Sequence, residues 1–192
     1  MNKLQKYLHN YIESPRDPMV NALLGEEYEK IGQGAAATSY FLRAAELWHD
    51  TEKHLAYNCF LKTWKQLYNT KRREGFEIGQ LKLAIAYLPT RPEAYYHASL
   101  WYSNRKEWVD SYMYAELGLK YINQSKGNPL KFDISYPGDY ALKFQKAFSC
   151  WYIGKRDLSK KLYLELLKDA NMEDKFKKIV IKNCQDFNLI KP

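Results

Sequence analysis

The sequence predicts an all-α protein, an α-solenoid in which antiparallel helix pairs follow one another along the chain. Three observations lead to this prediction. Apolar residues recur at helical spacing in successive segments of the chain. Turns with glycine, proline or charged residues separate these segments. Small residues occupy helix faces where a close approach to a neighbouring helix would need them.

Residues 21–47 show these features most clearly. They are expected to form a helix, a turn and a second helix. The first helix is marked by Leu24, Gly25 and Tyr28, the turn by Gly32 and Gly34, and the second helix by Ala37, Phe41 and Ala44. Two antiparallel helices approach closely only where a small side chain faces a large one, so we expect Gly25 to lie in the seam of this pair. Asp17 and Pro18 are expected to begin the first helix, as its N-cap and its first-turn proline.

The order and spacing of these residues resemble a tetratricopeptide (TPR) repeat. The resemblance covers about residues 18–170 and implies a superhelix of about four helix pairs with capping helices at its ends. We expect one helical-repeat domain, 1–192, divided as follows: an N-terminal helix in 1–16, repeat 1 in 18–51, repeat 2 in 52–90, repeat 3 in 91–122, a long loop in 123–139, repeat 4 in 140–170 and a C-terminal capping helix in 173–188.

The 123–139 loop interrupts the helical pattern with many turn residues. A loop of this length inside a compact domain is either functional or an ordered excursion that packs against its neighbours. The stretch Leu130 to Ile134 is apolar enough to be briefly extended. The sequence leaves both roles for the loop open.

The composition describes a basic protein with a real core, since 46% of its residues are hydrophobic and its net charge is +8. The charge favours acidic partners, but the dispersed basic residues also fit a solvated lysine-rich surface. Three well-separated cysteines, Cys59, Cys150 and Cys184, predict buried reduced thiols. Because no signal peptide and no membrane span is evident, we expect a cytoplasmic protein that makes no membrane contact.

The sequence predicts no catalytic residue, no cofactor and no metal site. The spacing of the histidines is not that of metal ligands on one helix face. The histidines are His9, His49, His54 and His97. Gly32 and Gly34 lack the Lys-Ser/Thr of a phosphate-binding loop. No nucleophile elbow occurs, and Cys59 and Cys150 lie in apolar helical runs that predict inert thiols.

A partner-binding groove is the remaining candidate site. In a TPR array the first helices of successive pairs line the concave side, which selects seven residues from repeats 2 and 3: Leu61, Lys65, Tyr68, Asn69, Tyr95, Ser99 and Tyr102. Aromatic and amide side chains with a lysine suit an extended peptide or a helix. The alternative is that these are ordinary core or solvated positions, because aromatic stripes at helical spacing are usually core.

A narrower resemblance involves four stretches of the sequence, 91–102, 114–119, 133–140 and 151–154. They are similar to helical-repeat segments that accompany family-2-like glycosyltransferases in bacteria and in phages of marine bacteria. This resemblance implies an accessory part in glycan modification, in the host cytoplasm if a phage encodes the chain. The chain lacks the Asp-x-Asp motif and the βαβ pattern of such transferases, so only their non-catalytic part is matched.

We therefore predict a non-catalytic protein-interaction module or scaffold with a protein or peptide partner. The alternatives are an accessory component of a glycosyltransferase system, a nucleic-acid-binding surface, and a self-assembling structural protein in which a homo-oligomer buries the aromatic excess. The nucleic-acid alternative would use a set of basic residues, Lys71, Arg72, Arg73, Lys155, Arg156, Lys160 and Lys161.

Overall fold

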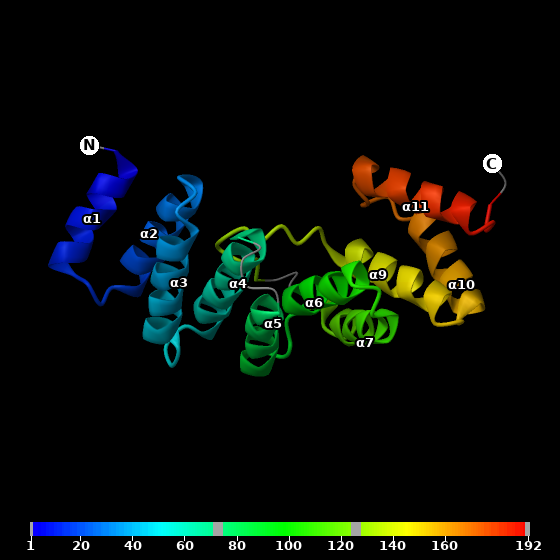
Figure 1. The fold of residues 1–192 in the computed structure, drawn as a ribbon, viewed down its shortest axis with the longest axis horizontal. Helices are drawn as coiled ribbons and strands as arrows, with labels where there is room; N and C mark the ends of the chain where they lie inside the picture. The colour runs from blue at the N-terminus through cyan, green and yellow to red at the C-terminus, as the bar shows by residue number, and fades with distance from the viewer. Residues whose placement is uncertain (1, 71–74, 124–127, 191–192) are drawn as a thin grey trace. The chain divides into compact units, whose positions relative to one another are not determined.

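The computed structural model describes residues 2–70, 75–123 and 128–190, and within these ranges the chain forms helices and no strand (Figure 1). The helices are α1 (Lys3–Glu13), α2 (Pro18–Lys30), α3 (Gly34–Trp48), α4 (Lys53–Thr70), α5 (Phe76–Tyr87), α6 (Pro92–Asn104), α7 (Trp108–Leu119), α9 (Asp139–Tyr152), α10 (Arg156–Leu167) and α11 (Asp174–Asp186). The pairs α2–α3, α4–α5, α6–α7 and α9–α10 pack within themselves, and α1 and α11 flank them. The predicted all-α solenoid of four helix pairs with end helices is confirmed. None of the described helices is both long and apolar enough to cross a membrane.

Helix contacts divide the chain into two compact units. Unit 1 holds α1 to α5 together with residues 128–135. Unit 2 holds α6, α7, α9, α10 and α11 together with residues 136–138. The single 1–192 domain stays a prediction.

Local sequence signals explain where several helices begin. The Asp17 carboxylate accepts hydrogen bonds from the backbone N–H groups of Met19 (2.7 Å) and Val20 (3.1 Å), and Pro18 is the first residue of α2. This confirms the predicted cap, which satisfies donors that have no partner inside the helix. Gly32, between α2 and α3, has a φ of +74°, a conformation that glycine adopts without strain.

Gly25 lies in the seam between α2 and α3, as predicted. A Cβ atom at Gly25 would lie 2.8 Å from Cδ1 and from Cε1 of Phe41, whose side chain is fully buried. Real Cβ atoms essentially never come so close to other heavy atoms. The missing side chain is therefore what lets α2 and α3 approach across the Phe41 ring.

Replacing Gly25 with leucine is expected to destabilise unit 1 by about 1–3 kcal/mol, because the added side chain overpacks against Phe41. The matched control is Gly79→Leu in α5, where a Cβ would meet no atom within 4 Å. The control is expected to be neutral or slightly stabilising, because leucine favours helix more than glycine does. Urea denaturation of both variants measures the difference. An unchanged midpoint for Gly25→Leu would place Gly25 outside the seam.

Unit 2 is built around a second close approach and an aromatic core. A Cβ at Gly118 of α7 would lie 2.8 Å from Cβ of Tyr95 and 2.9 Å from Cδ2 of Leu142, so α7 packs closely against both α6 and α9. The Phe144 ring lies 5.5 Å from the Phe176 ring, edge to face, which joins α11 to the core of this unit.

Candidate protein-interaction site

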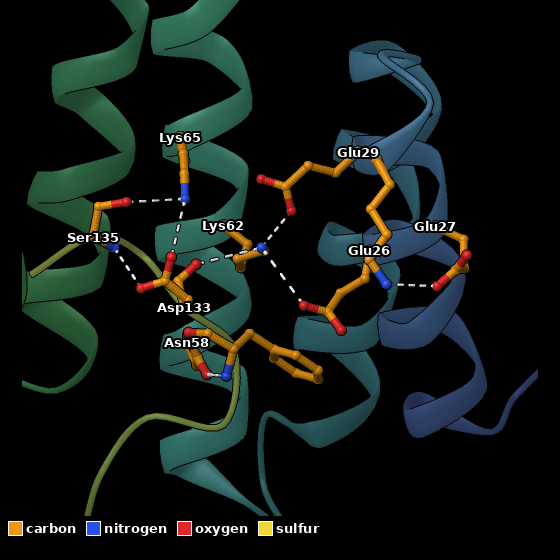
Figure 2. A network of polar contacts seen from close by, with 10 residues as sticks. Glu26, Glu27, Glu29, Asn58, Lys62, Lys65, Asp133 and Ser135 are labelled. Carbon is orange, nitrogen blue, oxygen red and sulfur yellow. Dashed lines mark hydrogen bonds and ion pairs between the residues drawn. The ribbon is translucent and has the colours of Figure 1, made fainter.

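Three polar side chains of α4 lie on one helix face, Asn58, Lys62 and Lys65, at the spacing i, i+4, i+7. We call them the α4 stripe. Asn58 and Lys62 are buried and Lys65 is partly buried. All three bind residues 130–135, a segment without helix or strand that runs along α4 (Figure 2).

The 130–135 segment lies against α4 without regular secondary structure, with bends at residues 131 and 132 and a φ of +60° at Ser135. Phe132 and Ile134 are buried, at 2% and 3% exposure, whereas Lys131, Asp133 and Ser135 are exposed. Alternate side chains of the segment are thus covered and exposed. The Phe132 ring centroid lies 6.5 Å from that of Phe41 in α3. The described part of the predicted 123–139 loop thus includes an ordered segment that packs on unit 1.

Asn58 holds the backbone of Phe132 through two hydrogen bonds. The Asn58 side-chain amide donates to the Phe132 carbonyl over 2.9 Å, and the Phe132 N–H donates to Asn58 Oδ1 over 2.7 Å. A primary amide offers one donor side and one acceptor side, so a single side chain satisfies both backbone groups of one residue. Buried backbone groups need such partners, and this pair fixes the register of the segment on α4.

Lys62 connects α2, α4 and the 130–135 segment. Its side chain is 4% exposed and forms ion pairs with Glu29 and, at 3.8 Å, with Glu26 of α2 (Figure 2). It also donates to the Asp133 carbonyl over 3.4 Å, and its Nζ lies 5.3 Å from the Phe41 ring centroid. A buried ammonium is tolerated when it is paired and hydrogen-bonded, and these partners meet that condition.

Lys65 contacts the exposed side of the segment. Its Nζ lies 3.6 Å from the Asp133 carboxylate and donates to the Ser135 hydroxyl over 3.2 Å. The Ser135 N–H, which donates to Asp133 Oδ1 over 2.9 Å, and then Lys65 hold the pKa of Asp133 below its usual value. Asp133 therefore stays anionic at neutral pH, and the stability that it contributes is lost only as the pH falls through this lowered pKa. Because the Asp133 side chain is 82% exposed, solvent screens this ion pair.

Four of the seven predicted groove residues belong to α4. Lys65 is a member of the α4 stripe, and Leu61 is fully buried. Tyr68 is 41% exposed and stacks on Trp64 with ring centroids 5.5 Å apart, and Asn69 is exposed. The structure thus leaves Lys65, Tyr68 and Asn69 accessible along the C-terminal half of α4.

The other three predicted residues lie on α6, in unit 2, and all are buried. Ser99 donates to the Ser111 carbonyl of α7 over 2.8 Å. Tyr95 stacks on Tyr121 (5.9 Å between centroids), and Tyr102 stacks in the same way on a tyrosine of α7 (5.3 Å). The role of all seven residues in partner binding stays a prediction.

The basic residues predicted for nucleic acid do not all fall in the described parts of the chain. Lys71, Arg72 and Arg73 lie outside the described residues. Lys155 lies 4.0 Å from the Tyr112 ring centroid and Arg156 lies 5.1 Å from that of Trp151. The other two, Lys160 and Lys161, line a surface hollow of about 360 Å³ on α10 together with acidic residues of that helix.

The cysteines are free and buried, as predicted. Burial raises the pKa of Cys59 to about 12, so this thiol stays protonated and is a weak nucleophile. Among the described residues there is no group of three or more histidine, cysteine, aspartate or glutamate side chains that could hold a metal ion.

Lys65 was predicted from the sequence, whereas Asn58, Lys62 and their partner, the 130–135 segment, were not. One signal was available. Asn58 and Lys62 are polar residues four apart, and the three residues between them, 59–61, are apolar, so both had to find partners on burial. The sequence could not say which partners, because Phe132 lies 74 residues further along the chain.

Comparison with known proteins establishes the fold. No family model and no curated protein sequence matches the chain. A crystal structure of MamA superposes with a TM-score of 0.63 at 20% sequence identity, over 86% of this chain and 85% of that chain. A second crystal structure of MamA protein superposes with a TM-score of 0.61 at 19% sequence identity, over 86% of this chain and 79% of that chain. The crystal structure of TTC0263, a thermophilic TPR protein in Thermus thermophilus, superposes with a TM-score of 0.55 at 15% sequence identity, over 97% of this chain and 89% of that chain.

These identities are too low to transfer a function, but the TM-scores and the coverage agree with the four helix pairs seen here. The resemblance to TPR repeats in the sequence is therefore matched by the three-dimensional structure. This chain has the fold of a TPR-like α-solenoid.

Proposed function

We propose that this protein is a non-catalytic protein-interaction module that binds an extended segment of a partner protein along α4. One observation carries the proposal: the α4 stripe already holds a non-helical peptide segment, by two backbone hydrogen bonds and two lysines. Side chains that hydrogen-bond the backbone of an extended peptide supply affinity, and contacts to its side chains supply selectivity.

The proposed contact surface extends along α4 beyond the stripe. Lys65, Tyr68 and Asn69 are partly or fully exposed there, so we propose that they touch the partner. The remaining predicted groove residues are buried, so we propose only a supporting role in packing for Leu61, Tyr95, Ser99 and Tyr102.

Affinity purification of the tagged protein from its native cells at two salt concentrations tests this function. We expect a defined protein to be retained at both concentrations, because apolar and backbone contacts are only weakly sensitive to salt. A nucleic acid held by several lysines would instead lose affinity by a factor on the order of a thousand between low and moderate salt. Recovery of nucleic acid alone, at low salt alone, would contradict the proposed function.

A matched control variant removes the basic surface of α10 by replacing four exposed residues with alanine: Lys155, Arg156, Lys160 and Lys161. We expect this variant to retain the protein partner. If the variant no longer retained the partner, the binding surface would have to be assigned to α10 and not to α4.

A second proposal comes from the resemblance of residues 91–102 and 133–140 to glycosyltransferase-associated segments. It assigns the protein to a bacterial or phage-encoded glycan-modifying system, as an accessory component. The same purification tests it, because a glycosyltransferase would then be among the retained proteins. Recovery of untagged copies of the chain would instead favour self-assembly.

A further inference from the structure

We propose that the 130–135 segment is an internal ligand of α4, and that a partner segment with consecutive aromatic, acidic and aliphatic residues displaces it. This proposal rests on the proposed function of α4 as a site for extended peptides. It adds the chemistry of the partner and a form of regulation, since the chain then competes with its own partner for one site.

The contacts of Asn58 are those of a general peptide receptor. Both of its hydrogen bonds go to the backbone of Phe132, so any chain that follows the same backbone path could accept and donate them. Selectivity has to come from the side chains on either side of this point. The side chains of Phe132 and Ile134 are almost completely buried. The site therefore favours apolar side chains two residues apart, the first of them aromatic, beside Phe41.

Charge selects the residue between these two apolar positions. The charge of Lys62 is balanced by Glu26 and Glu29, and its hydrogen bond to the segment goes to a backbone carbonyl. Lys65 faces the Asp133 carboxylate instead. An acidic side chain at this position is therefore attracted, and a basic one would be repelled by Lys65.

The way the segment is held allows displacement. The segment has no helix or strand, so its departure breaks no backbone ladder. Its hydrogen bonds and ion pairs to the described residues of unit 1 go to the α4 stripe. Because the segment is tethered, its effective concentration at α4 is on the order of millimolar. A free peptide binds only the fraction of molecules whose site is open, so its apparent affinity is reduced by that fraction.

A fluorescent peptide of residues 128–137 (NPLKFDISYP), titrated against the full chain by fluorescence anisotropy, tests the proposal. Two variants weaken the internal segment: Phe132→Ala removes its buried ring, and Asp133→Lys reverses its exposed charge. We expect the Phe132→Ala chain to bind the wild-type peptide at least about tenfold more tightly than the wild-type chain does. The Asp133→Lys chain is expected to show a smaller gain in the same direction, because solvent screens the contact that it reverses. A peptide of the same composition with Phe and Asp exchanged is expected to bind much more weakly to all three chains.

Two controls keep the result interpretable. Asn58→Leu, added to each weakened chain, is expected to abolish peptide binding. Circular dichroism checks that the helices persist, and Asp133→Lys is a safe second variant because the side chain that it replaces is largely exposed. Equal affinity for wild-type and weakened chains, absence of binding to helical variants, or equal binding of the exchanged peptide would each overturn the proposal.

Failure here is distinguishable from failure of the proposed function. A protein partner retained by the wild-type chain, together with no peptide binding by the weakened chains, would refute the internal ligand alone. A wild-type dimer that becomes monomeric when Phe132 is replaced would show that a second copy supplies the segment, which also overturns displacement by an external partner.

Discussion

Replacing Asn58 with leucine is expected to release the 130–135 segment and to destabilise unit 1 by about 2–4 kcal/mol. Leucine is close to asparagine in size but offers neither a donor nor an acceptor. The N–H and C=O of Phe132, at a residue with 2% exposure, would both lose their partner. The loss of stability in unit 1 cannot exceed the free energy that holds the segment on α4. Once the segment is released, its backbone groups hydrogen-bond to water instead.

Hydrogen exchange measured by mass spectrometry reports this release directly. Peptides that cover residues 128–135 should exchange faster in Asn58→Leu, while those from α2 and α3 should change less. The control is Lys65→Met, which removes a solvent-screened ion pair and should shift the free energy of unfolding by no more than about 1 kcal/mol. Unchanged exchange in 128–135 for Asn58→Leu would mean that its amide does not hold the segment.

The features that sequence predicted well depend on neighbours in the chain. Asp17 and Pro18 mark the start of α2 because a cap binds N–H groups two and three residues ahead. Gly25 could be placed in the seam because a small residue on an apolar helical stripe indicates close packing of a neighbouring helix, and Phe41 was near enough in sequence to be its partner.

The α4 stripe could be predicted only in part, because its partner is distant in sequence. Helical periodicity places Asn58 and Lys62 on one face of α4, but it does not say that the 130–135 segment covers that face. The tyrosines illustrate a second limit. Tyr95 and Tyr102 suit a groove and a core equally well from their chemistry, and burial in the folded chain was needed to show that both are covered.

Replacing Arg91 with methionine is expected to destabilise unit 2 by about 3–5 kcal/mol, the largest effect predicted for a single residue here. Arg91 is 2% exposed and Glu93 is 3% exposed. The Arg91 Nε donates to Glu93 Oε2 over 3.1 Å, and its Nη2 forms an ion pair with Glu93 Oε1. Methionine keeps much of the side-chain volume but leaves the Glu93 carboxylate buried without its guanidinium. Hydrogen exchange in α6, whose first turn contains Glu93, measures the loss.

The double variant Arg91→Met/Glu93→Leu separates two possible causes of that loss. If the arginine serves mainly to neutralise a buried carboxylate, removing both charges should restore most of the stability, because apolar replacements of buried ion pairs are often neutral or stabilising. If each side chain instead makes further essential contacts in unit 2, the double variant should be at least as unstable as Arg91→Met. The coupling energy of the double-mutant cycle decides between them, since a large coupling assigns the stability to the pair itself.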